Sequence, residues 1–321
     1  MYFDKTLLYN YYNKNTKKII IFATGGLVNA LNNVIGGMFL ASKLHLEPQL
    51  YWIKGYIALD IDINDIFDIN TKQIKLLTET EYGAIMKHDS LKLAHMYLPE
   101  FGQYTAFTNI SKLSLEQIAQ IVNSTIHTNI FYNNCEEYDW MTSYDPFFNV
   151  FKFKEFIWKN VNTFIHENNN IDTGIHIRGT DISCVLQDVI NTVYMCLEKN
   201  KNQNIFICSD DKKIEDALIT KYPNCKRYND KIYVEKYNEN LAWNIEATNN
   251  HLNCTYFNHD NKTFKMYSSY NVYRSKEHII GAVQDLLTLA KMTHIYAYKT
   301  SINSTYFKLA LKLREYLIGV K

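Results

Sequence analysis

The stretch Lys18-Ile19-Ile20-Ile21-Phe22-Ala23-Thr24-Gly25-Gly26-Leu27-Val28-Asn29 decides the fold class of this chain. Its first part, 18–23, is a short and continuous apolar run, which is typical of a β-strand buried on both faces. After the glycine turn, apolar residues recur along one face of a helix, at Leu27, Leu31, Val34, Met38 and Ala41. Strand, glycine turn and helix in this order predict an α/β fold.

The second half of the chain repeats this alternation. Strands are expected at 173–177, 204–208 and 293–298, and helices at 185–197, 212–222, 276–291 and 304–318. Such alternation indicates a parallel sheet with helices on both faces. In the first half, Ser114 and Gln117 have the spacing of a capping box, which predicts that a helix begins there.

The length of 321 residues favours two domains, because a single hydrophobic core stops growing at roughly 250 to 300 residues. The polar run Asn168-Asn169-Asn170 is typical of a linker. We therefore expect an N-terminal α/β domain over 1–168 and a C-terminal α/β domain over 169–321.

The composition excludes several classes of protein. With 34 basic and 33 acidic residues the net charge is +1, so the chain lacks the positive field that binds nucleic acid. The six cysteines form no C-x-x-C pair, which fits free thiols in a reducing compartment. Neither a signal-peptide pattern nor an apolar run of roughly 20 residues is present. We expect a soluble, cytoplasmic protein without a transmembrane segment.

Polar residues follow the predicted strands of the second half, where ligands bind in open α/β sheets. In Gly174-Ile175-His176-Ile177-Arg178-Gly179-Thr180-Asp181, His176 and Arg178 point to one face because strand side chains alternate. A guanidinium there favours an anion such as phosphate, and the alternative is an internal ion pair with Asp181. Ser209 and Asp210 end the next strand, where the carboxylates also suit the start of a helix.

Three further turns or helices carry candidate residues. Asp285 lies among apolar helix neighbours and therefore needs a polar partner. Thr300 and Ser301 follow the last strand. Hydroxyl groups at this place can hydrogen-bond phosphate or cap the following helix equally well. The Gly25-Gly26 turn and Asn29 would let the backbone approach a ligand, or they form only a tight turn.

No metal site is expected from the sequence. Asp60, Asp62 and Asp65 resemble the D-x-D motif of metal-dependent sugar transferases, but they alternate with apolar residues as in a half-exposed strand. The histidines and cysteines show no spacing typical of zinc ligands.

In their order along the chain, four segments resemble motifs of the fucosyltransferase superfamily, which includes the α1,2-, α1,6- and protein O-fucosyltransferases. They are Gly25-Gly26-Leu27 with Asn29, the segment 174–181, the segment 207–211, and the segment from Gln284 to Ser301. The resemblance implies a GT-B architecture, in which two Rossmann-like domains face each other across a cleft. It also implies inverting transfer without a metal or cofactor, from GDP-fucose as donor substrate to a glycan acceptor.

The same resemblance implies roles for single residues. Arg178 would pair with the donor's β-phosphate, His176 and Asp285 would contact the nucleoside, and Ser301 would hydrogen-bond phosphate. Asp188 is the carboxylate nearest in sequence to the position where some members carry a glutamate, so it is the candidate catalytic base. Arg178 is the other candidate catalytic residue. The other residues assigned to donor binding are Gly25, Gly26, Asn29, Ser209, Asp210 and Thr300.

Two alternatives stay open. Gly179 stands where many members of the superfamily carry a second arginine, and this favours a non-catalytic nucleotide- or glycan-binding module on the same scaffold. The other alternative is a transferase that uses a different nucleotide sugar.

Overall fold

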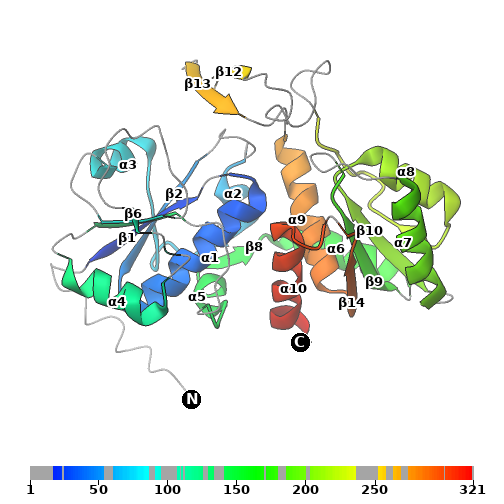
Figure 1. The fold of residues 1–321 in the computed structure, drawn as a ribbon, viewed down its shortest axis with the longest axis horizontal. Coiled ribbons are helices and arrows are strands. Elements are labelled where there is room, and N and C mark those ends of the chain that lie inside the picture. The colour runs from blue at the N-terminus through cyan, green and yellow to red at the C-terminus, as the bar shows by residue number, and fades with distance from the viewer. Residues whose placement is uncertain are drawn as a thin grey trace. The chain divides into compact units, whose positions relative to one another are not determined.

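The structure of the chain is a computed structural model (Figure 1). It describes residues 17–23, 25–53, 61–86, 91–94, 107–108, 110, 113–125, 129–133, 141–169, 171–179, 186–199, 203–235, 252–257, 263–268, 274–299 and 301–319.

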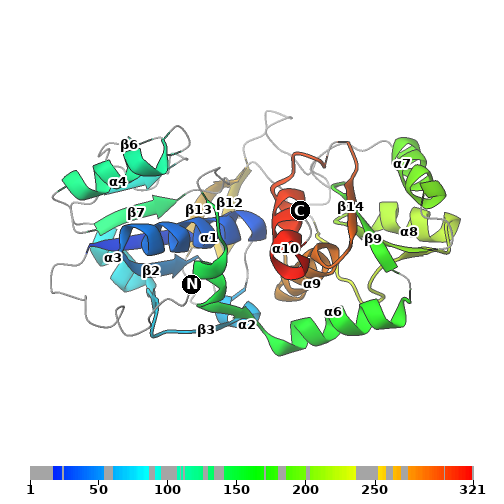
Figure 2. The same cartoon turned by 90° about the horizontal axis from the view of Figure 1, so that it is seen from below.

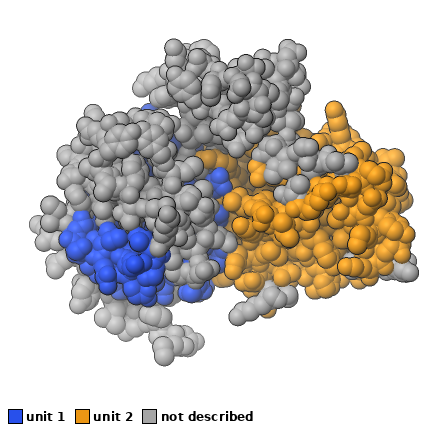
Figure 3. Space-filling model, viewed as in Figure 1, with its two compact units in different colours: residues 1–24, 29–53, 69–152 blue, residues 25–28, 54–68, 153–321 orange. Residues whose placement is uncertain are grey.

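The chain divides into two compact units (Figure 3). The first takes in residues 1–24, 29–53 and 69–152, and the second takes in residues 25–28, 54–68 and 153–321. Helix α6 (Glu155–Glu167) lies before the expected boundary at residue 168 but belongs to the second unit. Asn168, expected to begin the linker, is the C-cap of α6, and the next strand starts at Ile171.

The first unit is built on a parallel sheet with the strand order β4-β2-β1-β7-β5-β6. Ile19, Ile20 and Ile21 are fully buried, since β1 lies between two other strands and is covered on both faces. The strands are β1 (Lys18–Ala23), β2 (Glu47–Trp52), β4 (Lys75–Leu76), β5 (Leu91–Ala94), β6 (Phe107–Thr108) and β7 (Asn129–Asn133).

The helices of the first unit are α1 (Leu27–Leu44), α3 (Glu79–Met86), α4 (Leu115–Ser124) and α5 (Asp145–Phe148). On one side, Gly37 of α1 is close to Ile21 of β1. On the other side, Tyr82 of α3 stacks on Phe22 with ring centroids 5.3 Å apart. The chain passes between the units through α2 (Ile63–Ile66) and the paired short strands β3 (Phe67–Ile69) and β8 (Phe151–Phe153).

The second unit is built on a parallel sheet with the strand order β11-β10-β9-β14. The strands are β9 (Ile171–Ile177), β10 (Asn204–Ser209), β11 (Cys225–Lys226) and β14 (His294–Ala297). The helices are α6, α7 (Leu186–Lys199), α8 (Lys212–Lys221), α9 (Lys276–Ala290) and α10 (Thr305–Ile318). An antiparallel pair, β12 (Leu252–Phe257) and β13 (Thr263–Ser268), completes the described elements.

Helices lie on both sides of β9 (Figure 2), and alternate residues of this strand contact the two helix layers. Ile175 and Ile177 pack with Val189 of α7, while Gly174 leaves room for Leu289 of α9 and His176 stacks on α10. This is the sheet with helices on both faces that the sequence predicts, and each strand and helix expected in this half is confirmed to within a few residues.

Among the described residues, no helix is both long and apolar enough to cross a membrane. Cys196, Cys208 and Cys225 are buried, and none of these three is in a disulfide.

The predicted capping box at α4 is confirmed. The Ser114 hydroxyl accepts a hydrogen bond from the Gln117 N–H, and the Gln117 side chain accepts one from the Ser114 N–H. We expect Ser114→Ala to lower the free energy of unfolding by about 1 kcal/mol, measured by urea denaturation. Ser124→Ala at the other end of α4 is the matched control, and its expected effect is below about 0.5 kcal/mol. Equal effects of the two substitutions would show that the cap contributes nothing.

Candidate functional site

Hydrogen bonds tie together the segments that follow three parallel strands of the second unit. The Arg178 N–H donates to the Ser301 hydroxyl at 2.8 Å, and the Gly179 N–H donates to Asp210 Oδ1 at 2.7 Å. The Tyr298 N–H also donates to the His176 carbonyl at 3.0 Å. Because the carboxyl ends of parallel strands meet at one edge, the sheet itself brings Arg178, Asp210 and Ser301 together.

Gly179 is required by this geometry. A Cβ atom at this position would lie 2.7 Å from Cβ of Asp211 and 2.8 Å from Cδ1 of Ile214, well inside normal contact distance. Any other residue would push the Arg178 segment away from α8 or break its bond to Asp210. The absence of a second arginine after Arg178 therefore has a steric cause in this chain.

A buried polar cluster lies beneath the same edge. Glu215, fully buried in α8, accepts hydrogen bonds from the Ser209 N–H at 2.7 Å and from Lys231 Nζ at 2.6 Å, and it binds the Tyr233 hydroxyl. Lys231 also donates to the Ser209 carbonyl at 2.6 Å. Both backbone groups of Ser209 are thus held by two side chains, which fixes the end of β10.

Asp285 is the second carboxylate of this cluster. Its Oδ2 lies 2.7 Å from Lys231 Nζ, and only 5% of its side chain is exposed. Burial raises the pKa of Asp285 to about 6, and the neighbouring Glu215 acts in the same direction against Lys231. Burial alone would lower the pKa of Lys231, but the two carboxylates raise it, so the ammonium form is favoured. Lys231 is the polar partner that the sequence requires for Asp285.

His176 is buried against α10. Its ring stacks on Tyr306 with centroids 4.9 Å apart, its Nδ1 lies 3.8 Å from the Cys208 thiol, and its Nε2 lies 3.4 Å from the Ser304 hydroxyl. Burial lowers the pKa of His176 to about 4, so the imidazole is neutral near pH 7.

His278, in the first turn of α9, is a second buried histidine near this edge. Its Nδ1 lies 3.1 Å from the Ile232 carbonyl, and since a carbonyl only accepts, Nδ1 carries the proton. Burial, together with the positive charge of Arg274, lowers the pKa of His278 to about 4.

Exposure separates the predicted donor-binding residues of this unit. Arg178 and Asp210 are half-buried, whereas His176, Ser209, Asp285 and Ser301 are buried. Arg178 and Asp210 are thus the described residues of this set that solvent reaches. The buried residues of the set stabilise the backbone at this edge of the sheet.

Asp188, the candidate base, lies in the first turn of α7. Its Oδ2 accepts a hydrogen bond from Lys299 Nζ at 2.8 Å. In this ion pair the side chain of Lys299 is 67% exposed and that of Asp188 is 45% exposed. Lys299 lies two residues after the end of β14, which places Asp188 at the same edge as Ser301. Thr300 lies outside the described residues.

Gly25 and Gly26 form the turn between β1 and α1, and Asn29 lies in the first turn of α1. Gly25 has a φ of 89°, a left-handed conformation that favours glycine. The Asn29 carbonyl accepts a hydrogen bond from Asn33 Nδ2 at 3.0 Å. The role of this turn in donor binding stays a prediction.

The aspartates of the D-x-D segment have structural partners instead of the expected strand. Asp62 is the N-cap of α2 and accepts from the Asn64 N–H at 2.8 Å, and Asp65 pairs with Lys276 at 2.7 Å. Asp60 lies outside the described residues. Within the part of the chain that the structure describes, no three His, Cys, Asp or Glu residues are grouped as metal ligands.

Sequence reasoning missed Glu215, Lys231, Tyr233 and His278. Glu215 has the appearance of an ordinary acidic residue in the first turn of a helix. Lys231 lies in an irregular segment without periodicity. A pairing of Lys231 with Asp285 leaves no local signal, so only the fold reveals it.

Comparison with known proteins gives fold likeness alone. No family model and no curated protein matches the sequence. The NodZ α-1,6-fucosyltransferase, co-crystallized with GDP, is similar at 12% identity with a TM-score of 0.54, over 93% of this chain and 92% of that chain. POFUT1 in complex with GDP is similar at 10% identity with a TM-score of 0.52, over 95% and 97% of the two chains.

A mutant of FUT1 from Arabidopsis thaliana, in complex with GDP, is similar at 12% identity with a TM-score of 0.51, over 93% of this chain and 68% of that chain. These likenesses span nearly the whole chain, and they confirm the predicted α/β fold of the GT-B fucosyltransferase type.

We expect Glu215→Ala to destabilise the protein by about 3–5 kcal/mol, since it removes one of the two carboxylates that pair with buried Lys231 and leaves the buried Ser209 N–H without its acceptor. Urea denaturation measures this loss. Glu198→Ala on the exposed face of α7 is the matched control, with an expected change within about 0.5 kcal/mol. A loss below about 1 kcal/mol for Glu215→Ala would contradict the role given to the cluster.

The buried histidines predict acid sensitivity. The unfolded chain protonates His278 below its ordinary pKa of 6.5, whereas the folded chain does so only near 4, so stability falls as the pH falls through this window. Between about pH 7 and pH 5, the wild type should lose roughly 2 kcal/mol more unfolding free energy than His278→Gln. Urea denaturation at the two pH values checks this, and identical losses would refute it.

Proposed function

We propose that this protein is a glycosyltransferase that moves fucose from GDP-fucose to a glycan acceptor, with inversion and without a metal ion. Its partners are the nucleotide-sugar donor and the acceptor glycan. The observation that carries the proposal is Arg178, held by its backbone bond to Ser301 at the carboxyl edge of β9 with its side chain half-buried. The proposal is supported by the fold likeness to NodZ solved with GDP and with GDP-fucose, and to POFUT1 solved with GDP-fucose.

The proposed chemistry follows from the charge that forms on the departing diphosphate. The planar guanidinium of Arg178 carries N–H donors in a fixed geometry, so it can donate two parallel hydrogen bonds to phosphate oxygens. The N-terminus of α10, three residues after Ser301, presents backbone N–H groups and the positive end of the helix dipole. A preorganised guanidinium and helix amides stabilise developing negative charge without having to reorganise during the reaction.

The buried cluster supports this role indirectly. Glu215 and Lys231 hold both backbone groups of Ser209, and the next residue, Asp210, holds the N–H of Gly179. Arg178 is therefore positioned through its neighbour Gly179 by a chain of hydrogen bonds. We assign Glu215 and Lys231 to positioning and Arg178 to phosphate binding.

Asp188 is the base in this proposal. It lies at the edge that carries Ser301, and its carboxylate is bound to an exposed lysine and not to a buried partner. An exposed ion pair is worth only about 1 kcal/mol or less, so an acceptor hydroxyl can displace Lys299 at small cost and then donate its proton to Asp188.

The test is a thermal-shift panel of GDP, GDP-fucose, UDP and ADP with EDTA, on the wild type and Arg178→Ala. We expect GDP and GDP-fucose to raise the melting temperature of the wild type by about 5 °C at a hundredfold excess over Kd. Arg178→Ala should lose this shift and still unfold cooperatively, since its backbone bond to Ser301 remains.

The control separates binding from catalysis. Asp188→Asn should keep the GDP shift and lose release of GDP from GDP-fucose in the presence of a glycan mixture. A shift with UDP alone would point to another nucleotide sugar. A GDP shift without any donor turnover in the wild type would favour the non-catalytic binding module.

A further inference from the structure

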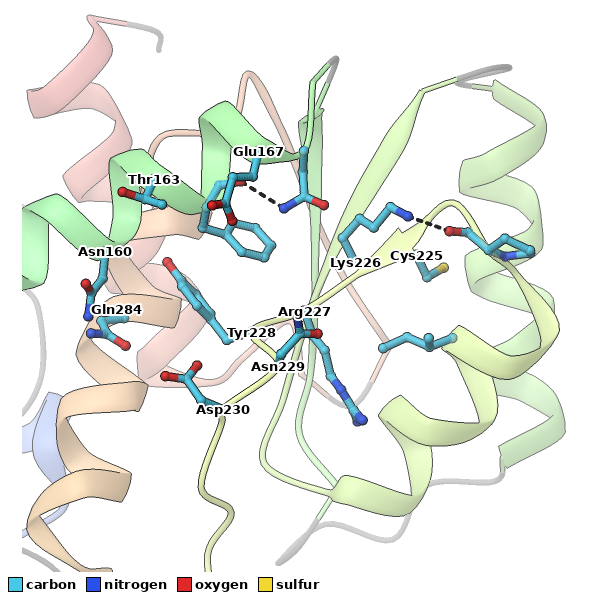
Figure 4. A pocket seen from close by; sticks show the side chains of 14 residues that line it. Asn160, Thr163, Glu167, Cys225, Lys226, Arg227, Tyr228, Asn229, Asp230 and Gln284 are labelled. Atoms are coloured by element: carbon cyan, nitrogen blue, oxygen red, sulfur yellow. Dashed lines mark hydrogen bonds between the residues drawn. The ribbon is translucent and has the colours of Figure 1, made fainter.

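A cavity of about 550 Å³ opens in the second unit on the side of the sheet that α6 and α9 cover (Figure 4). Residues of α6, the segment 223–230 around β11, and Gln284 of α9 line it. Its volume lies in the range of small-molecule binding sites, roughly 300–1,000 Å³. None of the residues predicted to bind the donor is among those that line it.

Two aromatic rings form a rigid wall of this cavity. The ring centroids of Phe164 and Tyr228 are 4.4 Å apart, at an interplanar angle of 31°. The Tyr228 hydroxyl is fixed by a 2.6 Å hydrogen bond with Thr288 Oγ1, and Phe164 packs edge-on against Phe206 of the central sheet. A ligand therefore meets an apolar surface that does not have to reorganise.

Polar side chains without a hydrogen bond to another described residue surround this wall. Asn160, Gln284, Asp230 and Glu167 line the cavity, as Figure 4 shows. None of these four side chains has a hydrogen bond to another described residue. Each amide offers both donors and acceptors, and each carboxylate accepts from hydroxyl groups.

The charges in the cavity disfavour an anion. Both of its cations are engaged by the protein: Lys226 Nζ donates to the Pro223 carbonyl at 2.8 Å, and Arg227 pairs with Asp216 at 2.6 Å. The carboxylates of Glu167 and Asp230 remain toward the cavity. A phosphate or nucleotide would meet these two negative charges, whereas a neutral polyhydroxylated molecule would find acceptors for its hydroxyls.

We propose that this cavity is a carbohydrate-binding site for a neutral pyranose oligosaccharide, separate from the donor site. One sugar ring packs its C–H face on Tyr228, and its hydroxyls bind the amides of Asn160 and Gln284 and the carboxylate of Asp230. Asp230 is followed in the chain by Lys231, and Gln284 by Asp285. Lys231 and Asp285 belong to the buried cluster below the donor site, so the same two segments contribute to the cavity and to that cluster. The proposal is independent of the transferase activity proposed above.

The test is saturation-transfer difference NMR with cellotriose, maltotriose and N-acetylchitotriose at millimolar concentration, on the full chain. We expect at least one of the three to bind the wild type. In the double variant Asn160→Ala/Gln284→Ala, loss of two hydrogen bonds should weaken that binding by roughly tenfold. Asn162→Ala is the matched control on α6, because Asn162 is outside the cavity and contacts Lys291, and it should bind like the wild type.

Absence of binding by all three oligosaccharides would overturn the proposal, and so would equal binding by the wild type and the double variant. The thermal shift with GDP is measured on the same samples. The double variant should keep it, which shows that the variant is folded and that the two sites are distinct. Loss of sugar binding in Arg178→Ala would place the sugar at the donor site and overturn the separate site.

Discussion

The carboxylate of Glu215 is the contact on which the proposed site depends. It is fully buried and binds the Ser209 N–H, the Lys231 ammonium and the Tyr233 hydroxyl, while Lys231 reaches on to Asp285. One lysine between two carboxylates satisfies buried groups that would each be costly alone. Breaking the cluster would leave several polar groups unpaired at once, so the end of β10, the segment around 231 and helix α9 are stabilised together.

The proposed site therefore lies at the carboxyl ends of the strands of the second unit, where buried side chains bind the backbone. Asp210 follows Ser209 and fixes the Gly179 N–H, and Ser301 fixes the Arg178 N–H. These bonds use backbone groups, and Arg178 is half-buried at the edge. Such preorganisation is what stabilisation of a departing diphosphate would require. The close approach of Gly179 to Asp211 shows why a single arginine stands here.

The fold likeness at 10–12% identity is understandable in physical terms. Buried parallel strands such as β1 and β9 require apolar residues of suitable volume, and many combinations of Ile, Val, Leu and Phe meet that requirement. Fold therefore persists while sequence diverges, and function has to be argued from the site. The polar cavity beside Tyr228 illustrates the same point, because it lies on the shared scaffold but is defined by side chains that the fold does not dictate.

Local sequence patterns are enough to predict the α/β class, the strands and helices of the second half, the capping box at Ser114 and the candidate edge around Arg178. These rest on periodicity and capping, which act over a few residues. The folded structure was needed to show that Lys231 is the partner of Asp285, that Asp188 pairs with Lys299, that Asp62 caps α2, and that Gly179 has no room for a side chain. Such contacts join residues as far apart as the 123 positions between Arg178 and Ser301. They depend on which strands become neighbours in the sheet, and no local pattern in the chain records that choice.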